Sequence, residues 1–271
     1  MSASTAESLA ESFACQRIGT GEYTADLGKR WVLPYGVIFG GAMMAAPLMA
    51  LDDHTGGRNV LATSCHFLRA GKPGPAVAVV DDVKQGRTTS THRVTLHQDD
   101  QAAVTILATV GPEATGSPRF ADPPPQLPPR SECSSPRTGD EEHFPDWIPF
   151  QDLLAPTDEI VDFFAGEFMQ EPDLRGWVRL RDDDSLDGAR LALLADDWPP
   201  SPWVLGQFGI MRTVELNLHL FHSGHRGWMT AHVRTRALFD DLFTVSGTLW
   251  SEGGEPLAEW RQVALFEPSD G

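Results

Sequence analysis

The chain has 271 residues, of which 41% are hydrophobic and 22% charged, so it is an ordinary globular sequence with room for one large domain or two smaller ones. Its formal net charge of −17 argues against a main function in binding nucleic acid, and more weakly against adhesion to anionic membranes. Its three cysteines, Cys15, Cys65 and Cys133, are widely spaced and form no CxxC pair, which excludes a disulfide framework and suits a reducing cytoplasm.

The N-terminal segment predicts neither a signal peptide nor a membrane anchor. It carries Glu7 and Glu11 and lacks a basic segment followed by an apolar run, so we expect a cytoplasmic protein. Residues 31–51 are uncharged and long enough to span a bilayer, but two prolines and three glycines interrupt them. We therefore expect a strand followed by a buried helix, Ala42–Asp53, rather than a membrane span.

After this helix, the first half of the chain reads as a series of strands. Segments rich in β-branched residues alternate with short polar turns that contain Gly, Pro or Asp. The predicted strands are Val60–Leu68, Ala76–Val83, Thr88–His97 and Ala103–Val110. This pattern indicates an antiparallel meander.

A change of composition then separates the two halves of the chain. Residues 113–145 contain runs of prolines and a polar Ser, Glu and Asp stretch, and such a segment cannot bury a core. We expect an N-terminal domain over 1–112, this linker, and a C-terminal domain over 146–271. Residues 146–185 fit either an inserted strand pair or a cover over a groove.

The second half follows the same order as the first. An apolar segment at Leu191–Ala195 leads into Asp196, Asp197 and a Pro-Pro pair, followed by a short apolar stretch to Ile210. The four strands expected after it are Thr213–Phe221, Gly227–Ala237, Phe243–Trp250 and Pro256–Phe266.

Matching residues at a constant offset indicate that the two halves are repeats. His66 and His219 differ by 153 positions, and the same offset relates Gly71 to Gly224, Thr91 to Thr244 and Leu96 to Leu249. The polar turn 98–101 falls on 251–254 without a gap. Each unit is then one buried helix wrapped by an antiparallel sheet, which is a hotdog fold. The predicted fold class is α+β, a double hotdog whose two units form a pseudo-dimer, with further homo-oligomers left open.

Several segments resemble the acyl-CoA thioesterase II family of double-hotdog enzymes. GVIFGGAMMAA is similar to the family's helix-opening glycine motif, and SCHFLRAGKPG to its first strand and turn. LLADDWPPS resembles the catalytic-aspartate loop, RTVELNLHLF the strand with a hydroxyl residue and an acidic residue two places on, and AEWRQVALF the final strand with a glutamine. The resemblance covers nearly the whole chain except the linker and 146–185.

The resemblance implies an acyl-CoA thioesterase with an Asp196, Thr213 and Gln262 catalytic set. It further implies substrate binding by Gly40, Gly41 and Glu215. A one-residue shift of the alignment would place Val214 at the hydroxyl position instead. Thr213 and Glu215 are two apart on a strand and are expected to share one face.

Thioester hydrolysis needs a positioned water, a group that accepts its proton, and donors for the developing oxyanion. Asp196 would orient or deprotonate the water, while Thr213 and Gln262 would hold it. Backbone N–H groups of a helix that starts after Asp196, with Pro199 and Pro200 in its first turn, would face the oxyanion. Without the family, an Asp before Pro-Pro is most often a plain helix cap, and a strand Thr or Gln is structural.

The alternatives are a non-catalytic acyl-binding or assembly protein and, less favoured, a hotdog dehydratase. At the offset of 153, Thr213 falls on Val60 and Gln262 on Thr109, so we expect one active centre per chain. The thioesterase hypothesis implies no cofactor. We also expect no metal, because three histidines on a strand running into a turn, at positions 219, 222 and 225, would not converge.

Overall fold

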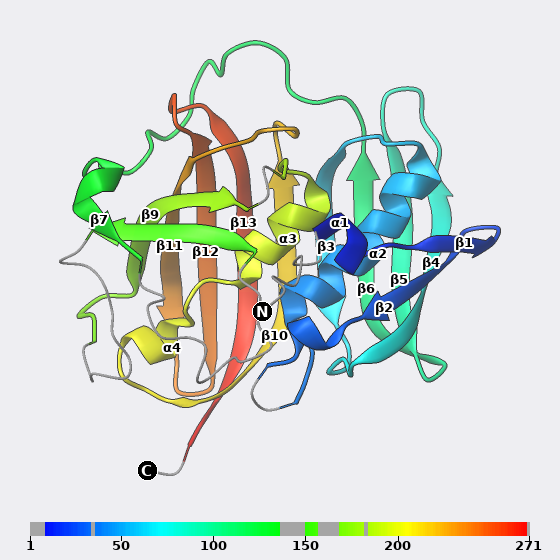
Figure 1. Ribbon diagram of the computed structural model, residues 1–271, viewed down its shortest axis with the longest axis horizontal. Helices are drawn as coiled ribbons and strands as arrows, with labels where there is room; N and C mark the ends of the chain where they lie inside the picture. The colour runs from blue at the N-terminus through cyan, green and yellow to red at the C-terminus, as the bar shows by residue number, and fades with distance from the viewer. Residues whose placement is uncertain (1–8, 34–35, 136–149, 157–167, 182–183, 270–271) are drawn as a thin grey trace, which may run out of the picture.

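The computed structural model describes residues 9–33, 36–135, 150–156, 168–181 and 184–269. Its strands form one sheet in the order β1-β2-β4-β5-β6-β3-β10-β13-β12-β11-β9-β8-β7, and every neighbouring pair is antiparallel. Figure 1 shows the two halves of the chain side by side in this sheet. The architecture is a double hotdog with an α+β composition, as the sequence predicts.

The first half supplies six strands and the longest helix. The strands are β1 (Gln16–Gly19), β2 (Glu22–Leu27), β3 (Val60–Phe67), β4 (Gly74–Lys84), β5 (Ser90–Gln98) and β6 (Gln101–Val110). The helices are α1 (Leu9–Ser12), the 3₁₀ turn η1 (Lys29–Trp31) and α2 (Gly40–Thr55). All four predicted strands are confirmed, and β1 and β2 are added ahead of them.

The second half supplies the remaining seven strands. They are β7 (Cys133–Ser134), β8 (Gln151–Pro156), β9 (Asp173–Leu180), β10 (Gly209–Leu220), β11 (Met229–Leu238), β12 (Leu242–Ser251) and β13 (Pro256–Pro268). The helices are η2 (Arg130–Glu132), α3 (Gly188–Asp196) and α4 (Ser201–Val204). Within 146–185, β8 and β9 extend the sheet beyond β11, so the described part of this region is a strand pair. Trp147, Phe163 and Phe164 lie outside the described residues.

The two units join where β3 pairs with β10. Residues 62–66 pair antiparallel with 215–219, and Ser64 stands opposite Asn217. These two residues are 153 positions apart, so the offset found in the sequence relates residues that face each other at the centre of the sheet. The pseudo-twofold axis of the repeat therefore passes through this seam.

Irregularities of the sheet repeat at the same offset. Among β3 to β6 of the first unit, β-bulges or similar register shifts fall at 60/62, 82/84 and 96/97, and among β10 to β13 of the second unit they fall at 213/215, 235/237 and 249/250. Each of the second set lies 153 residues after its counterpart. Because bulges are specific local features of a strand pair, this agreement confirms the internal repeat.

The gapless alignment is wrong for the last strand. Thr91 pairs with Thr109 in the first unit, whereas Thr244 pairs with Val263 in the second, an offset of 154 on β13. Four residues separate the paired residues His97 and Ala102 in the first unit, and five separate their counterparts Trp250 and Pro256 in the second, so this connection is one residue longer. Gln262 therefore corresponds to Ala108 and not to Thr109.

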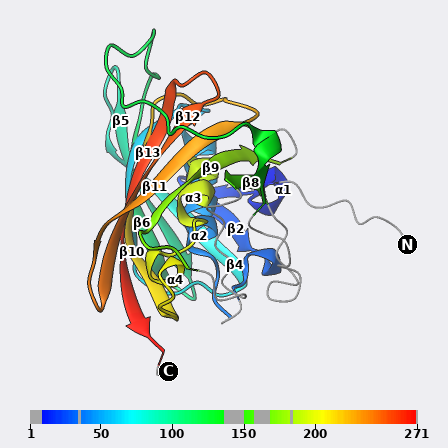
Figure 2. The ribbon, with the colours of Figure 1, turned by 90° about the vertical axis from the view of Figure 1, so that its left-hand side faces the viewer.

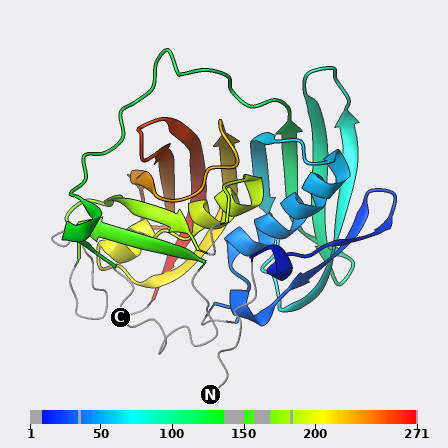
Figure 3. The same cartoon turned by 45° about the horizontal axis from the view of Figure 1, so that its top comes forward.

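Helices cover one face of the sheet, as the edge-on view shows (Figure 2). α2 begins at Gly40, and its buried residues surround most of its circumference, so it lies in the core as predicted. The strand expected before α2 is absent from the described residues: Lys29–Trp31 form η1, and Val32 makes an isolated bridge with Ile38. None of the described helices combines the length and the apolar character needed to cross a membrane. Figure 3 shows α3 lying beside α2 at the centre of this face.

The described part of the linker lies against the second unit. The backbone carbonyls of Asp122 and Pro128 accept hydrogen bonds from the indole N–H groups of Trp250 and Trp177, at 3.0 Å each. The segment 111–129 contains no helix or strand. The tryptophan contacts thus hold an otherwise irregular segment on the sheet.

A close contact in β12 gives a test of the packing. Gly247 is buried and faces Trp260 across the β12–β13 pair, and a Cβ at position 247 would overlap the Trp260 ring. Gly247→Ala should lower the unfolding free energy by about 1–3 kcal/mol through overpacking, measured by urea denaturation. Gly28→Ala is the matched control, because φ there is −60° and a Cβ would meet open space. Equal effects of the two changes would contradict the packing role of Gly247.

Candidate active site

The carboxylate of Asp196 lies at the junction of the two units. Asp196 is the last residue of α3, and it is half-buried. Its oxygens accept hydrogen bonds from one residue of the first unit and two of the second. The site is therefore assembled from segments that are far apart in the sequence.

The first-unit donor is the backbone N–H of Gly41, which lies 2.8 Å from Asp196 Oδ2. Gly41 belongs to the first turn of α2, where backbone N–H groups lack partners within the helix. The N-cap residue Phe39 cannot supply a side-chain acceptor, and none caps the helix from that position. Asp196 consequently takes the place of an N-cap for α2, with its negative charge at the positive end of the helix dipole.

Two glycines allow this approach. A Cβ on Gly40 would lie 2.6 Å from Asp196 Oδ2, and one on Gly41 would lie 2.6 Å from the Phe39 ring and 3.0 Å from the carbonyl oxygen of Ala192. The helix-opening glycines thus bring the helix start and the carboxylate together. Their predicted role in substrate binding remains a prediction.

Thr213 and Gln262 approach the other side of the carboxylate from β10 and β13. The Gln262 Nε2 group donates to Asp196 Oδ1 at 2.7 Å and to Thr213 Oγ1 at 2.7 Å. The Thr213 hydroxyl donates to Asp196 Oδ1 at 3.3 Å. The three predicted catalytic residues therefore form one hydrogen-bonded cluster.

The bulge in β10 decides which residues of this strand face the cluster. Thr213 contacts Asp196, whereas the exposed fraction of Val214 is 37%, so the structure favours Thr213 for the hydroxyl position. Beyond the bulge, Leu216 and Leu218 are buried on the helix side, and Glu215 bonds to Asn217 on the opposite face. The expectation that Thr213 and Glu215 share a face is wrong, because the bulge adds one residue between them. Glu215 does not join the cluster.

The environment of Asp196 raises the pKa of its carboxyl group to about 7. Burial is the largest cause, and the neighbouring charge of Asp197 adds to it. The hydrogen bonds from Gly41, Thr213 and Gln262 act in the opposite direction. The side chain can therefore exchange a proton near neutral pH.

The helix expected to start after Asp196 is not the one that meets the carboxylate. Asp196 ends α3, and α4 begins at Ser201, after Pro200 in the N-cap position. α4 has only four residues. The helix N–H group that bonds to Asp196 is that of Gly41 in α2. The relevant helix start belongs to the first unit, because α2 and α3 pack side by side across the seam.

The first unit lacks the polar pair of the second. Val60 stands at the bulge position that Thr213 occupies, and Ala108 stands at the position of Gln262. Both residues are apolar and buried. The structural correspondence therefore favours one active centre per chain, although Ala108 and not Thr109 is the counterpart.

Two contacts at this site have no direct signal in the sequence. The N–H of Gly41 cannot be identified from side-chain chemistry, and the amide of buried Gln151 donates to Asp197, 46 residues away. Of the three histidines at positions 219, 222 and 225, His219 pairs with Glu259 and His225 bonds to the carbonyl of Trp228.

Comparison with known protein families agrees with this arrangement. The family profile described as the acyl-CoA thioesterase N-terminal domain matches residues 29–111, and that of the C-terminal domain matches residues 121–266. The chain belongs to this acyl-CoA thioesterase family. No curated protein matches it significantly.

Solved structures share the fold of this thioesterase-family chain over nearly its whole length. A hotdog protein of unknown function from Alicyclobacillus acidocaldarius superposes with a TM-score of 0.84 at 19% identity, over 96% of this chain and 98% of that one. A candidate thioesterase II from Thermobifida fusca has a TM-score of 0.83 at 24% identity, over 94% and 96%. An acyl-CoA thioesterase II from Mycobacterium marinum has a TM-score of 0.73 at 18% identity, over 97% and 99%.

The raised pKa of Asp196 makes a prediction for stability. A carboxyl group with a raised pKa in the folded state favours folding below its unfolded pKa and loses that contribution as the pH rises through 7. Asp196→Asn removes this loss. The variant should gain unfolding free energy over the wild type between pH 4 and pH 8, by at most about 4 kcal/mol because partial solvent exposure reduces the effect.

Urea unfolding of both proteins at several pH values measures this gain. Asn keeps one oxygen for the Gly41 N–H, and the Gln262 amide can turn its oxygen toward the new amide group. A difference between the two proteins that stays constant with pH would contradict the raised pKa.

Proposed function

We propose that this member of the acyl-CoA thioesterase family hydrolyses acyl-CoA to a free fatty acid and CoA, without a cofactor and without a covalent intermediate. The observation that carries the proposal is the Asp196 carboxylate, which is held by Gly41 and bonded to Thr213 and Gln262. No histidine is among the hydrogen-bond partners of Asp196 in the described residues, which disfavours a hotdog dehydratase.

In this proposal, Asp196 is the general base. The bond from Thr213 to Asp196 is the longest in the cluster at 3.3 Å, and a water that replaces it would donate to Asp196 Oδ1 and accept from Thr213 or Gln262. Asp196 takes one proton as the water oxygen attacks the thioester carbonyl carbon. The carbon–sulfur bond then breaks, and the CoA sulfur leaves with that proton.

The start of α2 is the proposed oxyanion site. The helix dipole and the N–H groups of its first turn point toward the region occupied by Asp196. Gly41 already donates to the carboxylate, so Gly40 is the next donor that could meet the carbonyl oxygen of the substrate. The first unit would thus bind the thioester that the second unit hydrolyses.

The first test is thiol release from acyl-CoA substrates of increasing chain length. Asp196→Asn should lower kcat/KM at least about a hundredfold, the usual loss for a catalytic base. Asp197→Asn is the matched control, because it makes the same chemical change one residue further along the chain. It should retain turnover.

Three results would change the proposal. Turnover that survives Asp196→Asn would keep the reaction and reject the site. Equal losses in the two variants, with both folded, would show that the loop and not the carboxylate matters. If the folded wild type hydrolyses no acyl-CoA of any length, the non-catalytic acyl-binding or assembly alternative would replace the thioesterase.

The pH dependence gives a second test. A base must be ionised to accept a proton, so kcat/KM should rise with pH through an inflection near 7, the pKa of Asp196. The charge of Asp197 raises that pKa, so Asp197→Asn should move the inflection to lower pH. An unchanged or higher inflection in Asp197→Asn would contradict the assignment of Asp196 as the base.

A further inference from the structure

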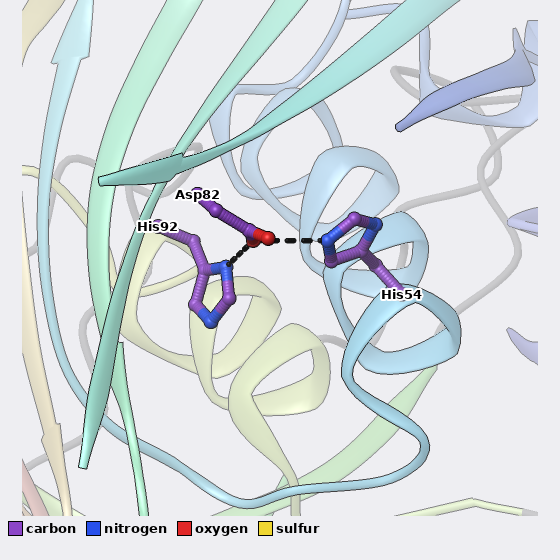
Figure 4. A group of neighbouring side chains, drawn as sticks. All are labelled: His54, Asp82 and His92. Carbon is purple, nitrogen blue, oxygen red and sulfur yellow. Dashed lines mark hydrogen bonds and ion pairs between the residues drawn. The ribbon is translucent and has the colours of Figure 1, made fainter. Parts of the chain in front are cut away.

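A second polar cluster lies at the other end of α2, within the first unit. It consists of His54 in the last turn of α2, Asp82 on β4 and His92 on β5 (Figure 4). Asp82 Oδ1 lies 3.1 Å from His54 Nε2 and 2.8 Å from His92 Nδ1. Neither the proposed reaction nor the family resemblance uses these residues.

The ligand atoms of the cluster converge as metal ligands do. One nitrogen from each imidazole and one carboxylate oxygen all lie within 4.8 Å of one another. A tetrahedral Zn²⁺ with bonds of about 2.0–2.2 Å keeps neighbouring ligand atoms about 3.3–3.5 Å apart. The two distances to Asp82 Oδ1, 3.1 Å and 2.8 Å, are slightly shorter than this spacing, so the ligand atoms would need only small shifts to admit an ion. Among the described residues, this is the one group of three or more such side chains that meets this criterion.

Further hydrogen bonds hold the ring nitrogen of His92 that does not face Asp82. The second ring nitrogen of His92, Nε2, lies 3.2 Å from the hydroxyl of Ser90, and Arg58 donates to the same hydroxyl at 2.6 Å. A fixed partner on the far nitrogen orients an imidazole and leaves the near nitrogen for a metal. Ser90 can accept from both neighbours, so His92 can carry its proton on Nε2 and use Nδ1 as a ligand.

Burial of the three side chains is uneven. The side chain of His92 is 2% exposed, that of His54 is 14% exposed, and that of Asp82 is 47% exposed. The imidazoles are therefore held by the protein while the carboxylate faces solvent. This arrangement gives an ion a route to the site and leaves a position for water.

The cluster is specific to the first unit. At the offset of 153, which holds for β4 and β5, Asp82 corresponds to Thr235 and His92 to Val245. Thr235 instead contacts the hydroxyl of Ser201 at the start of α4. Shared ancestry of the two sheets therefore does not account for the three residues.

We propose that His54, Asp82 and His92 bind one divalent transition-metal ion of the Zn²⁺ type, with water as the remaining ligand. Two imidazoles and one carboxylate suit such an ion, whereas Mg²⁺ and Ca²⁺ prefer oxygen ligands throughout. The ion would tie the last turn of α2 to β4 and β5. It would act on the fold of the first unit and not on the substrate.

The test is a calorimetric titration of the full-length, chelator-treated protein with ZnCl₂. The expected result is one ion per chain and a higher melting temperature in the presence of excess Zn²⁺. Asp82→Asn should weaken the binding at least tenfold and reduce the rise in melting temperature. Asn at this position can still accept hydrogen bonds from both imidazoles, so the variant is expected to remain folded without the metal.

The matched control is Asp173→Asn. Asp173 pairs with His232 on the sheet surface, and no second histidine joins this pair among the described residues. This change should leave zinc binding unaltered. As a second readout, Co²⁺ should produce visible absorption bands of a low-coordinate site in the wild type and in Asp173→Asn, and lose them in Asp82→Asn.

Two outcomes would overturn the proposal. One equivalent of Zn²⁺ bound equally well by the wild type and Asp82→Asn would place the ion elsewhere. No binding at micromolar Zn²⁺ by the folded wild type would make the cluster a hydrogen-bonded clamp only. Neither result depends on whether the chain hydrolyses acyl-CoA.

Discussion

The hydrogen bond between the Gly41 N–H and the Asp196 carboxylate caps the start of α2, joins the two units and positions the proposed catalytic base. α2 has an apolar N-cap residue, Phe39, so its first turn needs an acceptor from outside the helix. Asp196 supplies it from the end of α3, at 2.8 Å. The same contact requires the glycine pair, because a Cβ at position 40 would meet the carboxylate. It also explains why an ionisable group is tolerated in a partly buried place, since the helix start and two side-chain donors offset part of its desolvation.

The two units keep one backbone and differ in the polar residues placed on it. Bulges recur at the same offset, so strand twist and side-chain direction are set alike in both halves. At equivalent positions, however, the second unit has Thr213 and Gln262 where the first has Val60 and Ala108. The first unit in turn has the Asp82–His92 pair where the second has Thr235 and Val245. Each half thus has polar residues at positions where the other has residues that cannot form the same cluster.

The sequence predicts most of the fold and much of the site. β-Branched strands, polar turns and the 153-residue offset identify the double hotdog, and the family resemblance brings Asp196, Thr213 and Gln262 together. Two predictions were wrong, the face on which Glu215 lies and the residue of the first unit that corresponds to Gln262. Both have the same reason: a bulge and a longer turn each add a single residue, and one residue reverses which side of a strand a side chain faces. The Gly41 contact and the His54 cluster depend on how helices pack on the sheet. Residues separated by 155 and 28 positions meet there without any local pattern.

The β3–β10 seam also has a thermodynamic consequence. The seam and the Gly41–Asp196 contact both couple one unit to the other, and the sheet runs through the junction without interruption. Separation of the halves would expose two long strand edges and leave the start of α2 without its acceptor. The chain should therefore lose its structure in a single cooperative step, as small domains do. A substitution in either half would then lower the stability of the whole molecule, including the part that it does not touch.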